Sequence, residues 1–99
     1  MNHKSYALVT GASSGCGVQY ARVLARRGYN LLIVSNEEAI NDRANEIHTE
    51  FPEVTIVPLV RDLSLQSAAK ELFDYCHEHN MVVEVLVNNA GVYHDKDIL

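Results

Sequence analysis

Four short apolar runs, separated by stretches with helical spacing, constrain the fold of this chain more than any other feature. The runs cover residues 5–10 and 31–34, then 54–57, and finally Val82 with residues 85–87. In the first two runs the apolar residues are consecutive, as in strands that are buried on both faces of a parallel sheet. The pattern predicts four such strands.

The stretches between the strands repeat apolar residues every three or four positions, which predicts three helices. The first covers residues 15–28 and ends at Gly28. The second follows Ser35–Glu38, which matches the S-x-x-E capping box, and stops at Pro52. The third covers about 65–79, with Ser64 as its N-cap. The predicted inner faces are Val18, Ala21, Leu24, Ala25 and Gly28 in the first helix, Ile40, Ala44, Ile47 and Phe51 in the second, and Leu65, Ala68, Leu72, Tyr75 and Cys76 in the third.

Strands and helices therefore alternate strictly, in the order βαβαβαβ. Helical connections of this length demand parallel strands and right-handed crossovers. We predict an α/β fold with one open, doubly wound, Rossmann-like sheet. Its strand order is 3-2-1-4 if it follows the dinucleotide-binding plan. The 99 residues form one domain at most.

A glycine-rich stretch, Thr10–Gly17, connects the first strand to the first helix. Such a turn directs free backbone N–H groups and the positive end of the helix dipole at an anion. Gly11 permits the tight turn, Gly15 lets a phosphate approach the backbone, and Gly17 lets the helix lie near the strand. The spacing G-x-x-x-G-x-G is a variant of the dinucleotide-binding fingerprint.

Two other interpretations of this stretch stay open at this point. Gly11–Gly15 also fits G-x-S-x-G, in which Ser13 would be the nucleophile of a serine hydrolase. In the second interpretation, the stretch is a glycine-rich loop that binds no ligand. A P-loop is excluded because no lysine follows the last glycine.

Composition excludes several classes of function. The net charge is −5 and the eight basic residues are scattered, so the sequence lacks the cluster of basic residues that nucleic-acid binding requires. No apolar run approaches membrane-spanning length, and no signal peptide is present, so we expect a cytoplasmic protein. Cys76, His77 and His79 do not converge on one helix face, and no metal site is expected.

Four motifs lie at corresponding places after the four strands: Thr10–Gly17, Ser35-Asn36, Asp62-Leu63 and Asn88-Asn89-Ala90-Gly91. Together they resemble the N-terminal cofactor-binding portion of the short-chain dehydrogenase/reductase family. The resemblance implies an oxidoreductase that uses NAD or NADP to transfer hydride to or from an alcohol or carbonyl substrate. It covers the whole chain, but only part of the family's usual domain, so residues 1–99 are expected to be a truncated cofactor-binding domain.

The resemblance also implies roles for individual residues. The glycine turn would hold the ribose and pyrophosphate, Asp62 and Leu63 would meet the adenine, and the last motif would lie along the nicotinamide side. The implied cofactor-binding residues are Gly11, Ser13, Ser14, Gly15, Cys16, Gly17, Ser35, Asn36, Asp62, Leu63, Asn89, Ala90 and Gly91. Asn89 would also tie the central strands together.

The choice between NAD and NADP stays open at this stage. In the family, the residues after the second strand determine which of the two cofactors binds, and this chain has the neutral residues Ser35 and Asn36 there. Glu37 and Glu38 follow, and they would disfavour a 2′-phosphate only if they turned inward. The capping box predicts that they face the start of the helix instead.

The catalytic part of the family lies beyond this sequence. Its chemistry needs a downstream Asn, a Ser and a Tyr-x-x-x-Lys, and none of the five tyrosines here is followed by lysine four residues later. We therefore assign no catalytic residue and expect the 99-residue chain alone to be inactive. A non-catalytic dinucleotide sensor is the alternative function. The fourth strand would be an exposed apolar edge, which predicts self-association through residues 84–88.

Overall fold

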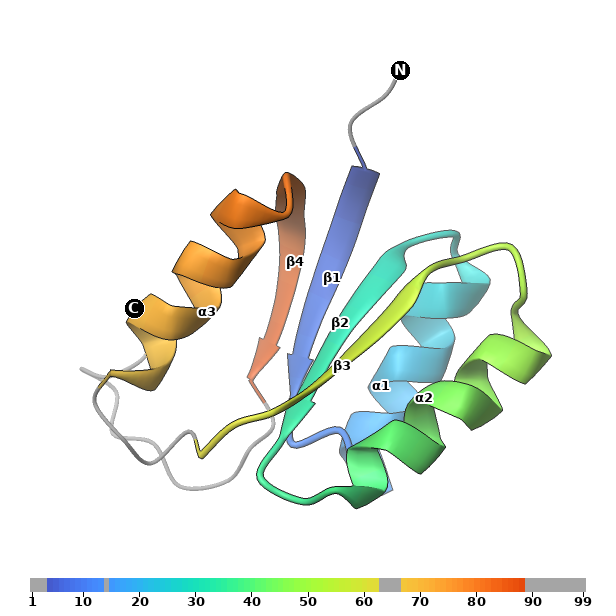
Figure 1. Cartoon of the computed structure of the whole chain (residues 1–99). Helices are drawn as coiled ribbons and strands as arrows, with labels where there is room; N and C mark the ends of the chain where they lie inside the picture. The colour runs from blue at the N-terminus through green and yellow to red at the C-terminus, as the bar shows by residue number, and fades with distance from the viewer. Residues whose placement is uncertain (1–3, 14, 63–66, 89–99) are drawn as a thin grey trace.

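The computed structural model describes residues 4–13, 15–62 and 67–88. Strands and helices alternate along this part of the chain (Figure 1). The elements are β1 (Lys4–Thr10), α1 (Gly15–Arg26), β2 (Asn30–Ser35), α2 (Ala39–Glu50), β3 (Ile56–Val60), α3 (Ala68–Glu78) and β4 (Met81–Asn88).

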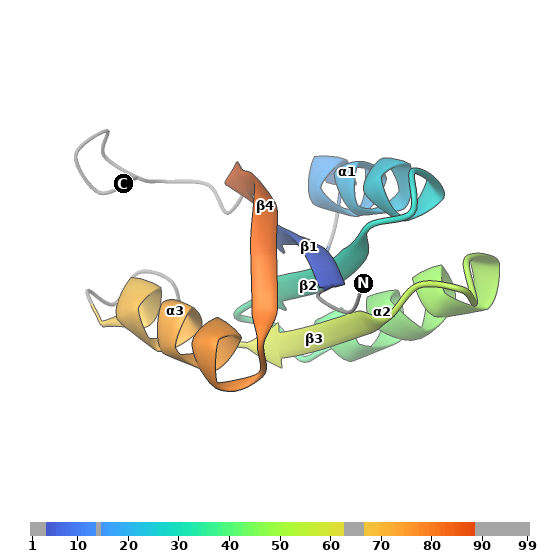
Figure 2. The ribbon, with the colours of Figure 1, turned by 90° about the horizontal axis from the view of Figure 1, so that it is seen from above.

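The four strands form one parallel sheet in the order β3-β2-β1-β4, which confirms the predicted topology. Helices α1 and α2 cover one face of the sheet, and α3 covers the other (Figure 2). A helix connects each strand to the next one along the chain, as parallel strands require. The carboxyl ends of all four strands therefore meet at the same edge of the sheet.

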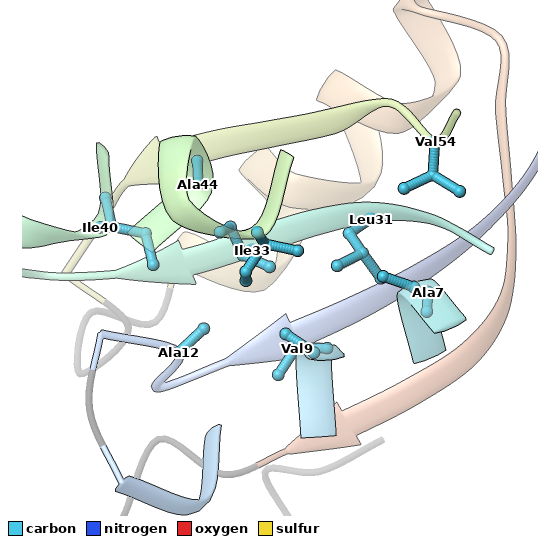
Figure 3. Packing of buried hydrophobic residues seen from close by; sticks show 11 residues of the cluster. Ala7, Val9, Ala12, Leu31, Ile33, Ile40, Ala44 and Val54 are labelled. Carbon is cyan, nitrogen blue, oxygen red and sulfur yellow. The ribbon is translucent and has the colours of Figure 1, made fainter. Parts of the chain in front are cut away.

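The consecutive apolar residues of β2 are explained by burial on both faces. Leu31 and Ile33 belong to the cluster under α1 and α2, whereas Leu32 and Val34 belong to the cluster under α3. All four are completely buried. Figure 3 shows the larger cluster, in which Ile33 lies among residues from β1 and α2. The central strands thus hold the core, and the site is built on their ends.

The predicted helical faces are largely confirmed. The small residues Ala21 and Ala25 of α1 are buried, and Leu24 packs beside them. In α3 the buried residues are Ala68, Leu72 and Cys76, whereas Leu65 lies outside the described residues. Gly28 is exposed, so its predicted place on the inner face of the first helix was wrong. It lies two residues after the end of α1 and has a positive φ of 94°.

Most element ends lie within two residues of their predicted positions, and the third strand and third helix differ most. The third strand covers Ile56–Val60 rather than 54–57, because Val54 precedes it in a turn that packs on the core. Pro58 lies inside this strand, which is tolerated because β3 is at the edge of the sheet. The third helix begins at Ala68 after Ser67, and the predicted N-cap, Ser64, lies outside the described residues.

The capping box at Ser35–Glu38 was also wrong. Glu38 is the residue before α2, its backbone is helical, and its side chain makes no capping hydrogen bond. Ser35 is the last residue of β2, and its hydroxyl accepts a hydrogen bond from the backbone N–H of Glu37 at 3.1 Å. Such a bond to the backbone two residues on is a local serine turn that competes with capping.

The described helices include none that is both long and apolar enough to span a membrane.

Candidate functional site

The glycine-rich turn between β1 and α1 folds over the end of the neighbouring strand. The backbone N–H of Ala12 donates a hydrogen bond to the carbonyl oxygen of Val34 at 3.3 Å, and Ala12 is completely buried. The turn is therefore fixed across the carboxyl ends of β1 and β2. In open α/β sheets, ligands bind in this region.

Two glycines explain the shape of the turn. A Cβ placed on Gly17 would collide with the backbone of Gly11 and lie 2.9 Å from the Cα of Ala12, so the first turn of α1 can approach the strand only with glycine there. Gly15 has a φ of 56°, and a Cβ there would meet nothing within 4 Å. The turn is thus tightly packed on its inner side and open at Gly15, as a phosphate cradle requires.

The start of α1 carries favourable electrostatics for an anion. The first backbone N–H groups of a helix have no partner within it, and the helix dipole adds positive potential there. Gly15 and Cys16 are exposed, and the first turn of α1 contains no acidic residue. The residues present therefore fit a pyrophosphate group, which needs backbone donors rather than a dedicated side chain.

The segment after β2 closes the site on one side. Ser35 is buried and Asn36 and Glu37 are exposed. The hydroxyl of Ser13 donates a hydrogen bond to the Glu37 carboxylate, with 2.8 Å between Oγ and Oε1. Glu37 thus turns toward the glycine turn, contrary to the orientation that the capping box predicted.

The segment after β3 lies beside the same strand end. The backbone N–H of Arg61 donates to the carbonyl oxygen of Ser35 at 2.9 Å, which extends the pairing of β2 and β3 by one residue. The Arg61 guanidinium lies 3.9 Å from the Glu71 carboxylate on α3. Asp62 follows as an exposed residue.

A side-chain link joins the ends of β1 and β4 on the other side. The Thr10 hydroxyl donates to Oδ1 of Asn88 at 3.1 Å and lies 3.4 Å from the carbonyl oxygen of Val87. Thr10 is buried. Sequence reasoning assigned the tie between the central strands to Asn89, which lies outside the described residues; in the structure Asn88 makes such a tie.

The structure brings most of the predicted site residues to one edge of the sheet. Those placed at the ends of β1, β2 and β3 are Gly11, Ser13, Gly15, Cys16, Gly17, Ser35, Asn36 and Asp62. Five further predictions, Ser14, Leu63, Asn89, Ala90 and Gly91, fall outside the described residues. Glu37 and Thr10 are the polar contacts that sequence reasoning missed, although both lie within or beside the predicted motifs.

A second group of titratable residues lies between α3 and the sheet, away from this edge. Burial raises the pKa of the Cys76 thiol, and burial followed by the nearby Tyr75 and Cys76 raises the pKa of Tyr6. The His79 ring stacks on Tyr75 with 4.0 Å between ring centroids. Within the described part of the chain, no three His, Cys, Asp or Glu side chains gather as metal ligands.

Comparison with known protein families agrees with this geometry. The family model for short chain dehydrogenase matches residues 5–99. This chain belongs to the short-chain dehydrogenase family. The match covers the glycine turn, all four strands and the segments that follow them.

Two curated relatives are similar to this chain over part of their length. A very-long-chain 3-oxoacyl-CoA reductase of Kluyveromyces lactis is 40% identical over 93 residues, which cover 91% of this chain and 26% of that protein. The uncharacterized oxidoreductase YvaG of Bacillus subtilis is 36% identical over 88 residues, which cover 88% of this chain and 32% of that protein. The chain therefore spans about a quarter to a third of the length of these relatives.

Solved structures of short-chain dehydrogenases confirm the fold. YwfH, described as an NADPH-dependent reductase involved in bacilysin biosynthesis, superposes with a TM-score of 0.83 at 30% identity, covering 89% of this chain and 35% of that one. A metagenomic short-chain oxidoreductase in complex with NADP has a TM-score of 0.80, also at 30% identity, covering 89% of this chain and 39% of that one.

Proposed function

We propose that residues 1–99 are the cofactor-binding part of an NAD(P)-dependent oxidoreductase. The parent protein would transfer hydride between the nicotinamide ring and the carbon of an alcohol or carbonyl substrate. Family membership supports the reaction class, and the similarity to NADPH- and NADP-binding reductases supports the cofactor class.

The observation that carries the proposal is the close packing of Gly17 against the turn at Gly11. It leaves the backbone of Gly15 open and holds the start of α1 over the ends of β1 and β2. A pyrophosphate placed there would accept hydrogen bonds from backbone N–H groups. The other predicted contacts, from Ser14, Leu63 and residues 89–91 to the ribose, adenine and nicotinamide, are part of the same proposal.

Calorimetric titration of the chain with ADP and with NADH tests the proposal directly. ADP contains the adenosine and pyrophosphate groups, which are the groups that the described residues fit. We expect saturable binding of both ligands. The absence of ADP and NADH binding to a folded chain would refute it.

Two substitutions at Cys16 provide a matched comparison. Cys16→Asp places a negative charge in the first turn of α1, where it stabilises the helix but repels a pyrophosphate. Cys16→Asn has a similar size and no charge. We expect the aspartate variant to lose at least about tenfold in ADP affinity while remaining folded, and the asparagine variant to lose much less.

We also propose that this chain alone does not catalyse hydride transfer. The sequence contains no Tyr-x-x-x-Lys, and a tyrosine near its ordinary pKa of about 10 is a poor general base without a neighbouring cation. An assay of NADH oxidation with simple ketones should show no turnover at cofactor concentrations that saturate binding. A turnover that depends on the intact chain would overturn this statement.

The hydrolase interpretation of Ser13 has no support in the geometry. A nucleophilic serine needs an adjacent general base, which in hydrolases is a histidine. The Ser13 hydroxyl instead donates to Glu37, and no histidine of the described segments hydrogen-bonds to it. The dinucleotide sensor remains the alternative to an enzyme, and a parent sequence without Tyr-x-x-x-Lys would favour it.

The isolated chain would associate with a second copy through β4. Among the described strands, β4 lies at the edge of the sheet and pairs with β1 alone. Val82 and Leu86 are 42% and 49% exposed, and the Phe73 side chain of α3 is 59% exposed. A long edge strand with apolar side chains is a template for pairing with another chain.

A further inference from the structure

Helix α1 rests on the sheet through small residues. Its buried residues are Gly17, Ala21 and Ala25, and Leu24 packs beside them but is only partly buried. A face of this kind lets the helix approach the strands closely, but it offers little more than methyl groups to interlock with the side chains of the sheet. The sheet alone therefore does little to fix the position of α1 along its axis.

Two arginines connect α1 to the end of α2, and the two helices lie side by side (Figure 1). Nε and Nη2 of Arg22 lie 2.9 and 2.7 Å from the same carboxylate oxygen of Glu50. One turn later, the Arg26 guanidinium lies over the Phe51 ring, 6.0 Å from its centroid. Glu50 is the last residue of α2 and Phe51 is its C-cap. Because cations are favoured at the C-terminal end of a helix, the dipole of α2 supports both contacts.

This connection holds α1 from one side. Residues two positions apart on a helix point about 200° away from each other, so Tyr20 lies on the side of α1 opposite Arg22. Tyr20 is 49% exposed. Among the ion pairs between described residues, the pair of Arg22 with Glu50 is the one that joins α1 to another element. The position of α1 therefore depends on its contacts with α2.

The start of the same helix forms the proposed phosphate cradle. Helix α1 begins at Gly15, and Arg22 follows seven residues later, about 10 Å along the helix axis. Arg22 is thus too far away to contact a pyrophosphate at the start of the helix. A shift of α1 at Arg22 would nevertheless move the backbone N–H groups of Gly15 and Cys16, because the helix is a continuous hydrogen-bonded unit. Donors bind a ligand most tightly when they are already in place before it arrives.

We propose that Arg22 and Glu50 are positioning residues for the phosphate cradle. Their ion pair fixes α1 against α2 and so holds the first backbone N–H groups of α1 where a pyrophosphate requires them. The inference rests on the proposed dinucleotide-binding function. Arg26 and Phe51 support the same contact one turn further along α1. The affinity for a nucleotide thus depends on an ion pair that does not touch the nucleotide.

The variants Arg22→Met and Glu50→Gln test the inference because charge and positioning predict different signs. By charge alone, loss of the Arg22 cation weakens the binding of anionic ADP, whereas loss of the Glu50 anion strengthens it. Positioning instead predicts that both variants bind ADP more weakly, by about two- to fivefold, the range that a partly exposed ion pair supports. Calorimetric titration of the full chain at low ionic strength measures the affinities, after circular dichroism has shown that each variant is folded.

Two double variants separate the ion pair from its individual residues. Arg22→Met combined with Glu50→Gln should bind ADP no more weakly than either single variant, since each single change already removes the contact. Arg22→Glu combined with Glu50→Arg restores an ion pair with reversed charges and leaves the net charge unchanged. We expect this exchange to recover most of the ADP affinity that either reversed residue loses alone.

Arg43→Met and Glu46→Gln provide the matched control. These residues form an ion pair of 2.9 Å within α2, which joins no second element, so both variants should bind ADP like the unmodified chain. Unchanged ADP affinity in Arg22→Met and Glu50→Gln, or stronger binding by Glu50→Gln, would overturn the inference while nucleotide binding by the unmodified chain stands. Failure of the unmodified chain to bind ADP would refute the proposed function itself.

Discussion

The Thr10 hydroxyl donates a hydrogen bond to Oδ1 of Asn88 at 3.1 Å and so joins the carboxyl ends of β1 and β4. Thr10 is only 5% exposed, whereas Asn88 is exposed. The contact connects residues that are 78 positions apart in the sequence. It holds the end of β4 against β1, the strand that leads into the glycine turn, and so fixes the position of β4 relative to the proposed phosphate site.

We predict that Thr10→Val lowers the free energy of unfolding by about 1 kcal/mol, since a typical hydrogen bond contributes about 0.5–1.5 kcal/mol and the two side chains have the same shape. Denaturant unfolding measures the loss. The double variant with Asn88→Ala should lose less stability than the sum of the two single effects, because both single changes remove the same contact. Strict additivity would show that the two residues act separately.

We predict that Gly17→Ala destabilises the chain by about 1–3 kcal/mol, the usual cost of placing extra atoms in a packed region. The added methyl group would collide with the Gly11 backbone, and a backbone cannot rotate away as a side chain can. The same variant should weaken ADP binding, which requires the undistorted turn. Gln19→Ala, at an exposed position of the same helix, is the control and should unfold like the unmodified chain.

We predict that a thiol reagent modifies Cys16 much faster than Cys76. Cys16 is exposed, whereas Cys76 is 5% exposed and burial raises the pKa of its thiol above the ordinary value of 9.0. A raised pKa leaves less of the reactive thiolate at any given pH, so Cys76 should require a more alkaline solution. Mass spectrometry of time points distinguishes the two sites. Saturating ADP should slow modification of Cys16 alone; equal protection of both would contradict the proposed site.

We predict that Leu86→Lys reduces self-association of the isolated chain. A lysine on an exposed edge strand opposes pairing with another copy, because burying its charge in the new interface is unfavourable. Sedimentation equilibrium over a range of concentrations gives the association constant. Tyr20→Lys alters another exposed large hydrophobic residue, on α1, and should change it little. A monodisperse monomer at high concentration of the unmodified chain would refute the proposed association.

The sequence determined the architecture because its signals were redundant. The consecutive apolar residues of β2 could be satisfied only by burial on two faces, and helical connections then imposed parallel strands. The strand order was predicted from the dinucleotide-binding plan rather than from the residues, and the structure confirmed it. The start of the third strand was predicted wrongly because Val54 packs on the core from the turn before β3, and so has the apolar side chain of a strand residue.

The orientation of Glu37 could not be predicted from local sequence. Ser35–Glu38 satisfies the capping-box pattern, but Ser35 is required as the last residue of β2 and its hydroxyl binds the Glu37 backbone. The competing contact with Ser13 spans 24 residues, so it exists only once the turn has packed over Val34. The position of the Glu37 carboxylate therefore depends on tertiary contacts, which the local sequence does not specify.

The position of Pro58 makes the two edges of the sheet unequal. The neighbouring residues Thr55 and Arg61 pair inward with β2, and the alternation along the strand places Pro58 on the outward side, where it removes a donor from the free edge of β3. Growth by edge pairing is therefore favoured only at β4. Two copies that join there would leave an edge interrupted by proline at each end of the combined sheet. We therefore expect such an assembly to stop at a symmetric pair instead of extending into a fibre.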